Sequence, residues 1–139
     1  RPYSVASHSL MVADILALAR EPVAVIRAGL LHDASEAYLC DLARPVKDHM
    51  PDYRAFEDRL QAVIEERFSV RITASQRAAV KKADNTALMV EREQLMQVPP
   101  APWQPVETYD LGFQLYCSDE CWRLTKARFL RRCSQLGIS

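Results

Sequence analysis

Apolar residues recur along this chain at the three- and four-residue spacing of an α-helix, which limits its fold more than any other feature. The first stripe begins after Ser7 and consists of His8, Met11, Val12, Ile15 and Ala19. Residues at this spacing share one face of a helix, and an apolar face is buried against a neighbouring element. Ser7 belongs to the residue types that favour the N-cap, so we expect the helix to begin there. The chain has only three glycines and few alternating β-branched runs, which argues against a sheet.

A second helix is expected to begin at Pro22, because proline suits the first turn of a helix. It runs through His32 and Asp33 to Glu36, where spacings of three and four residues would bring these side chains together over one turn. A bend is expected after it, because Pro45 disfavours a helical backbone at the residue before it.

Three later helices follow from the same pattern. One covers residues 51–68 and is expected to bury a face formed by Tyr53, Phe56, Leu60, Val63, Ile64 and Phe68. Another opens at Thr73 and Gln76, which have the spacing of a capping box. Four prolines between residues 98 and 109 predict an extended loop. The last helix covers about residues 118–136 and is expected to turn inward Cys121, Trp122, Thr125, Phe129, Leu130 and Cys133.

These helices fit within one domain. A chain of 139 residues is long enough for one sizeable core, and 49% hydrophobic with 26% charged residues is ordinary for a globular protein. We therefore predict an all-α fold, a single compact helical bundle over residues 1–139 on which the last helix packs.

The charge balance limits the classes of partner. Eighteen Lys and Arg residues match eighteen Asp and Glu residues, so no bulk positive field indicates a nucleic-acid polymer as partner. Pairs such as Lys81-Lys82 are typical of a solvated helix face. No segment has the pattern of a membrane span or a secretory signal, so we expect no membrane partner and a cytoplasmic location. The sequence starts with Arg1 instead of Met, so we expect that an upstream segment can be missing.

Four residues stand out because each is ionisable and lies on the apolar side of a predicted helix: His8, His32, Asp33 and Asp84. An unpaired ionisable group in such a place is costly, whereas two imidazoles and two carboxylates form a ligand set for a divalent metal ion. A single inward histidine is more often a satisfied core residue than a ligand. Four such residues on three helices, including one adjacent His-Asp pair, favour a metal site. Glu36, one turn further on, would serve that site as an acid–base residue.

Longer strings surround these residues, namely Val5-Ala-Ser-His8, His32-Asp-Ala-Ser-Glu36, Asp41-Leu-Ala-Arg-Pro-Val-Lys47 and Ala83-Asp84. In this order they resemble the HD superfamily of metal-dependent phosphohydrolases, whose members share the pattern H…HD…D. They are most similar to YfbR-like 5′-deoxynucleotidases and to phage-type deoxynucleoside triphosphohydrolases. The motifs fall within residues 1–96, and the last helix carries none that matches.

The resemblance implies a role for each matching residue. The two histidines and two aspartates named above would bind one divalent metal ion, and the ligand types leave Mn, Co, Fe, Mg and Zn open. Glu36 would handle the proton, and Asp41 would be a carboxylate beside the substrate. Lys47 is either a phosphate contact or a solvated lysine.

The resemblance also implies an activity, the hydrolysis of small (deoxy)nucleotides, with 5′-nucleotidase-type removal of phosphate preferred. Release of triphosphate from a deoxynucleoside triphosphate is the alternative reaction. A non-catalytic metal- or nucleotide-binding regulatory module is the alternative of another class, but degenerate members lose a ligand or the proton-handling acid, and this chain keeps all five. Relatives of the resembled family are often homodimers. Base and sugar preference stay open.

Overall fold

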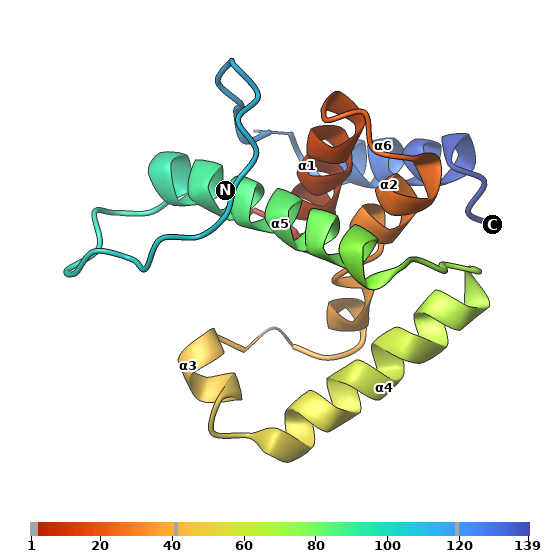
Figure 1. Cartoon of the computed structure of the whole chain (residues 1–139), viewed down its shortest axis with the longest axis horizontal. Coiled ribbons are helices and arrows are strands. Elements are labelled where there is room, and N and C mark those ends of the chain that lie inside the picture. The colour runs from red at the N-terminus through yellow and green to blue at the C-terminus, as the bar shows by residue number, and fades with distance from the viewer. Residues whose placement is uncertain (1–2, 41, 119) are drawn as a thin grey trace.

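Helices make up the regular secondary structure of the computed structural model, which describes residues 3–40, 42–118 and 120–139 (Figure 1). In chain order they are α1 (Val5–Leu18), α2 (Val23–Leu30), the 3₁₀ helix η1 (Ala34–Ala37), α3 (Arg44–Lys47), α4 (Pro51–Arg67), α5 (Ala74–Leu95) and α6 (Trp122–Gln135). The described ranges contain no strand, so the predicted all-α class is confirmed. Within those ranges, no helix combines the length and the apolar character needed to cross a membrane.

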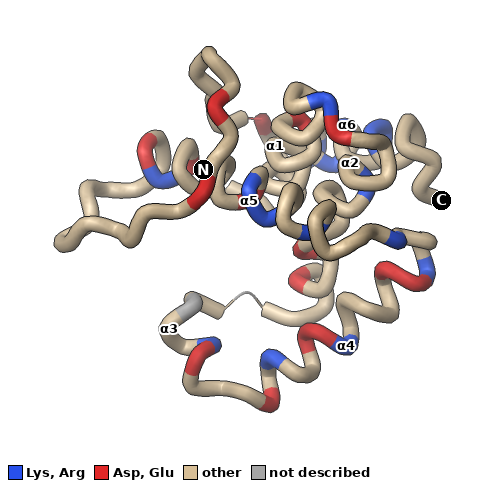
Figure 2. Tube along the Cα trace, viewed as in Figure 1, with Lys and Arg blue, Asp and Glu red and all other residues tan. Residues whose placement is uncertain are grey.

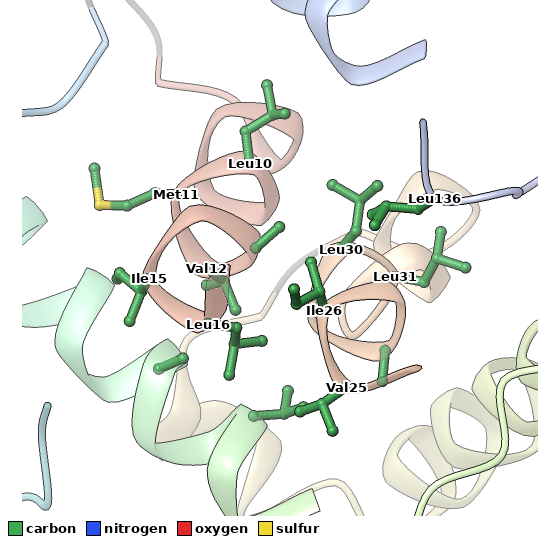
Figure 3. Packing of buried hydrophobic residues seen from close by; sticks show 14 of the residues in the cluster. Leu10, Met11, Val12, Ile15, Leu16, Val25, Ile26, Leu30, Leu31 and Leu136 are labelled. Atoms are coloured by element: carbon green, nitrogen blue, oxygen red, sulfur yellow. The ribbon is translucent and has the colours of Figure 1, made fainter. Parts of the chain in front are cut away.

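The core lies where α1, α2 and α5 meet, and α6 packs against α1 as well (Figure 3). The largest side chains shielded from solvent are Val12, Ile15 and Leu16 on α1 and Val25 and Leu30 on α2. Full burial of one such side chain contributes about 1.5–3 kcal/mol. Gly29 permits the close approach of α1 and α2, because an added Cβ there would lie 2.3 Å from Leu16 Cδ1. The apolar stripe of the first helix therefore supplies much of the core, as its spacing predicts.

The first helix begins earlier than predicted. Its N-cap is Ser4, whose Oγ accepts a hydrogen bond from the Ser7 backbone N–H at 3.1 Å. Ser7 lies inside the helix and is buried, so the prediction of Ser7 as the N-cap is wrong. Both serines suit a cap chemically, but Ser4 has the extended backbone that an N-cap requires.

The second helix ends at Leu30, so the predicted continuation to Glu36 is wrong, and His32 and Asp33 lie in a turn before η1. The His32 ring donates a hydrogen bond from Nδ1 to the backbone oxygen of Gly29 at 2.8 Å. In a continuing helix that oxygen would accept from the Asp33 N–H. The side chain thus competes with the helix for a backbone acceptor.

A glutamine from a distant helix completes the break. Gln61 on α4 donates from Nε2 to the Leu31 backbone oxygen at 2.8 Å and accepts from the Ser35 backbone N–H at 3.2 Å. In a continuous helix Ser35 N–H would donate directly to Leu31 O. The Gln61 amide is therefore inserted where one helical hydrogen bond would have been.

The fourth helix has its predicted range but not its predicted burial. Figure 1 shows α4 apart from the bundle of α1, α2, α5 and α6, and its main contacts are with η1 and α3. Phe56 and Val63 are 51% and 60% exposed, and Ile64 is the buried member of the predicted inward face. An amphipathic pattern fixes which face is apolar, not whether another element covers it. The short α3 begins at Arg44, so the prediction that Pro45 keeps the residue before it out of a helix is wrong, and Pro45 lies in the first turn of α3.

Helix α5 confirms its predicted start, whereas the last helix begins at Trp122, later than predicted, and buries a narrower face than predicted. Thr73 and Gln76 form a capping box at the start of α5. On α6, Thr125 and Cys133 are buried as predicted, but Trp122 is 67% exposed and Leu130 is 57% exposed. Cys121 precedes α6 as its N-cap residue and is also exposed. Figure 2 shows acidic and basic residues interspersed along the helices, in keeping with the equal numbers of the two charges.

Candidate metal centre

Three elements of the bundle bring four ionisable side chains to one place. His8 comes from the end of the first turn of α1, His32 and Asp33 come from the turn after α2, and Asp84 comes from the middle of α5. The packing of α1, α2 and α5 around the shared core fixes their relative positions. Their side chains are 13–32% exposed, so the group lies at the edge of the core within reach of solvent.

The potential ligand atoms of these residues converge. His8 Nε2 lies 3.3 Å from His32 Nε2 and 3.2 Å from Asp84 Oδ1. His32 Nε2 lies 3.1 Å from Asp33 Oδ2 and 3.8 Å from Asp84 Oδ1, and His8 Nε2 lies 3.7 Å from Asp33 Oδ2. Ligands about 2.1 Å from a common centre are about 3.0 Å apart in an octahedron and about 3.4 Å apart in a tetrahedron. The ligand atoms of His8, His32 and Asp33 all lie within 4.8 Å of one another, which suits one metal ion, and Asp84 Oδ1 adjoins the two histidines without completing such a group with Asp33.

Both imidazoles are oriented by their other nitrogen. His8 Nδ1 donates to Glu91 Oε1 at 2.7 Å, and His32 Nδ1 donates to the Gly29 oxygen at 2.8 Å. A carboxylate and a carbonyl can only accept, so each Nδ1 carries its proton and each Nε2 can offer a lone pair. Outer hydrogen bonds of this kind hold metal-binding histidines in proteins. The donor set thus fits a divalent metal ion in chemistry as well as in spacing.

The electrostatics of the group depend on the carboxylates around the rings. Burial lowers the pKa of His8, but hydrogen bonds with Asp84 and Glu91 outweigh it and raise that pKa to about 10. Burial also lowers the pKa of His32, and hydrogen bonds with Asp33 and Asp84 raise it to about 9. Burial raises the pKa of both aspartates, but the adjacent rings hold each below its usual range. In the absence of a metal ion, the added proton on each imidazole offsets the negative charge of the neighbouring carboxylates. A bound cation would displace these two protons.

Glu91 belongs to this site although the sequence analysis did not select it. It is 8% exposed and lies on α5 seven residues after Asp84. Seven residues are nearly two helical turns, so the inward stripe of Val80, Ala83, Asp84 and Ala87 continues to Glu91. That continuation was the signal that could have identified it.

Lys81 and Lys82 face different surroundings: Lys81 is exposed, as predicted for a solvated face, whereas Lys82 is half-buried. Lys81 donates from Nζ to Asp84 Oδ2, the carboxylate oxygen that faces away from the histidines. Lys82 Nζ lies 3.2 Å from Glu107 Oε1 and 4.9 Å from the centre of the Tyr109 ring. Lys81 therefore adjoins the metal centre, whereas Lys82 holds the loop after α5.

The predicted acid–base residue and phosphate contact lie together in a second cluster. Lys47 Nζ is 3.9 Å from Glu36 Oε1 and 2.8 Å from Glu57 Oε1 on α4. Glu36 sits in η1, where its backbone N–H donates to the Asp33 oxygen at 3.0 Å. Asp41, the predicted carboxylate beside the substrate, lies outside the described residues. The structure thus joins η1 to α3 and α4 through charged side chains, and Glu57 was not foreseen.

Curated proteins with related sequences share part of this chain. The uncharacterized protein YfdR of Escherichia coli K12 is 36% identical over 93 residues, which are 67% of this chain and 48% of that protein. An uncharacterized protein of Rhodobacter capsulatus is 38% identical over 98 residues, which cover 67% of this chain and 50% of that protein. The chain spans about half the length of these relatives. No family model and no solved structure matches it.

Proposed function

We propose that this protein is a divalent-metal-dependent phosphohydrolase of the HD superfamily that acts on small (deoxy)nucleotides, with 5′-nucleotidase-type removal of phosphate as the leading reaction. The observation that carries the proposal is the grouping of His8, His32 and Asp33, with Asp84 Oδ1 at 3.2 Å from His8 Nε2 and 3.8 Å from His32 Nε2. Both rings present Nε2 to the centre because Nδ1 is engaged elsewhere. The sequence strings around these residues support the same superfamily.

The four ligands would hold the ion, and the cluster beside them would handle the proton. A divalent metal ion bound there supplies Lewis-acid chemistry, which makes a water molecule more acidic and draws charge from a phosphoryl oxygen. Lys47 Nζ lies 3.9 Å from Glu36 Oε1, and a carboxylate in this place can act as a base.

In the proposed reaction the oxygen of a water molecule bonds to phosphorus while the ester bond to the nucleoside oxygen breaks. Glu36 accepts a proton from the water and returns one to the departing oxygen. Lys47 neutralises part of the phosphate charge, and its contact with Glu57 ties that role to the position of α4.

The test is a hydrolysis screen of the purified protein with added Mn²⁺ or Co²⁺ against deoxynucleoside monophosphates and triphosphates. We expect phosphate release from monophosphates and its loss when the metal is chelated. His8→Gln and His32→Gln should abolish metal binding, whereas His49→Gln is the matched control because His49 is the exposed third histidine. Glu36→Gln should retain the metal and lower kcat by about 10²–10⁴-fold.

The outcomes separate the alternatives. Release of tripolyphosphate from triphosphates would identify the other hydrolase reaction. Metal binding without turnover of any nucleotide would favour the non-catalytic module and refute the enzyme. Absence of metal binding by the native chain would refute the site itself.

A further inference from the structure

We propose that Glu91 is a positioning residue that makes His8 the more strongly donating of the two imidazole ligands. The inference rests on the proposed metal site and extends it to a residue to which neither the sequence motifs nor the resemblance assigns a role. Its basis is the contact between Glu91 Oε1 and His8 Nδ1 at 2.7 Å.

Glu91 is a buried carboxylate that forms an ion pair with His8. It is 8% exposed, and an unpaired carboxylate at such burial is strongly unfavourable. Among the described residues, the cationic partner recorded for Glu91 is His8. A glutamine or a leucine would have filled the same place on α5 without that cost. The Tyr3 hydroxyl also lies near Glu91, but the ion pair of this buried carboxylate is with the His8 ring.

The two histidines differ in what lies behind them. His8 donates to a carboxylate, whereas His32 donates to the neutral backbone oxygen of Gly29 at 2.8 Å. A hydrogen bond to an anion is shorter and roughly twice as strong as one to a neutral acceptor. It withdraws the Nδ1 proton and increases the electron density that Nε2 offers to a cation. His8 is thus both fixed in one tautomer and made more basic as a ligand.

The distance along the chain explains how the arrangement is built. His8 lies on α1 and Glu91 lies on α5, and these helices pack closely against each other. Asp84 on the same face of α5 provides a ligand, so one helix supplies both a ligand and the support of another ligand. A small shift of α5 would move both together.

The experiment compares Co²⁺ affinity in the full chain and in three variants. Glu91→Gln keeps the shape and an oxygen acceptor but removes the charge, and Glu91→Asp keeps the charge but shortens the reach. Glu93→Gln is the matched control, because Glu93 is exposed on the same helix. We expect Glu91→Gln to weaken Co²⁺ binding by about 10–100-fold, and Glu93→Gln to leave it unchanged.

A second readout reports on His8 directly. Long-range ¹H–¹⁵N spectra of the Zn²⁺-loaded protein should show Nδ1 of His8 protonated and Nε2 bound to the ion. In Glu91→Gln the Nδ1 proton signal should move by more than that of His32, whose acceptor is untouched. If Glu91→Gln does not fold, Glu91→Asp tests the role of the charge instead. Because aspartate keeps the negative charge, we expect Glu91→Asp to weaken Co²⁺ binding by less than about tenfold.

The results distinguish this inference from the proposal beneath it. If the native chain binds neither Co²⁺ nor Zn²⁺, the metal site fails and Glu91 fails with it. If the native chain binds Co²⁺ and Glu91→Gln binds it equally well with an unmoved His8 signal, the metal site stands and the role of Glu91 is overturned. A Glu91→Asp protein that loses binding altogether would also overturn the role of charge.

Discussion

Replacement of Gln61 by alanine should loosen the turn that carries two of the proposed metal ligands, although Gln61 is not itself a proposed ligand. Its side-chain amide makes two hydrogen bonds, to Leu31 O at 2.8 Å and from Ser35 N–H at 3.2 Å. Each such bond contributes about 1 kcal/mol net, and loss of the partner of a buried donor costs more. Ser35 is 4% exposed, so Gln61→Ala should lower the free energy of unfolding by about 2–3 kcal/mol.

The chain offers a matched control for this change. Gln94 on α5 also bridges a carbonyl and an N–H, donating to Leu115 O at 2.7 Å and accepting from Cys117 N–H at 2.8 Å. It holds the loop after α5 and not the turn at His32. Gln94→Ala should therefore cost a similar stability, about 2 kcal/mol, by the same count of hydrogen bonds.

The assay measures two quantities in each variant: the free energy of unfolding in urea, followed by circular dichroism, and the Kd for Co²⁺. Both variants should be destabilised, but only Gln61→Ala should bind Co²⁺ more weakly, by about tenfold or more. Equal Co²⁺ affinity in the two variants would refute the view that Gln61 positions the ligand turn. An unchanged urea midpoint for Gln61→Ala would refute the hydrogen-bond count.

Three further predictions concern other parts of the site. The pKa of His8 rises from 6.5 to about 10, and the pKa of His32 rises from 6.5 to about 9. The charged rings therefore stabilise the metal-free fold fully below pH 6.5, and this contribution is lost as the pH rises through 9 and 10. Urea unfolding in EDTA across that range should show the decline, and Co²⁺ affinity should rise over the same range because binding displaces those protons; a flat stability profile would contradict the assignment. Lys81→Ala removes a positive charge beside Asp84 and should tighten Co²⁺ binding by about threefold or more while raising KM for a phosphate substrate, and Lys82→Ala should change neither. Gly29→Ala places a Cβ 2.3 Å from Leu16 Cδ1 and should lower the thermal midpoint of unfolding. Overpacking costs about 1–3 kcal/mol, which exceeds the gain of about 0.5–1 kcal/mol in helix propensity. An unchanged midpoint would mean that the buried leucine repacks without cost.

Local patterns predicted the helices whose signals are local. The capping box of Thr73 and Gln76 and the start of a helix at residue 51 are both found, because each depends on a few consecutive residues. The convergence of His8 and Asp84 could also be predicted from the sequence, since an ionisable group on an apolar stripe must face other helices. Glu91 lies on the same side of α5 as Asp84, seven residues further on, and the same reasoning extended past Asp84 would have identified it.

Other features depend on contacts that no local pattern encodes. The break after Leu30 requires an amide from Gln61, thirty residues further along the chain, at Leu31 O. The exposure of Phe56 and Val63 depends on where α4 docks, which its own periodicity does not state. Glu57 meets Lys47 only because α3 folds back on α4.

The interrupted helix has a geometric consequence for the His32-Asp33 pair. Neighbouring side chains on an intact α-helix diverge by about 100° around its axis, so two consecutive residues there would point at different targets. Because the helix is interrupted here, the two side chains can point to the same place, with His32 Nε2 and Asp33 Oδ2 only 3.1 Å apart. A substitution that turned this segment into regular helix would keep both proposed ligands in the sequence and still move their side chains apart.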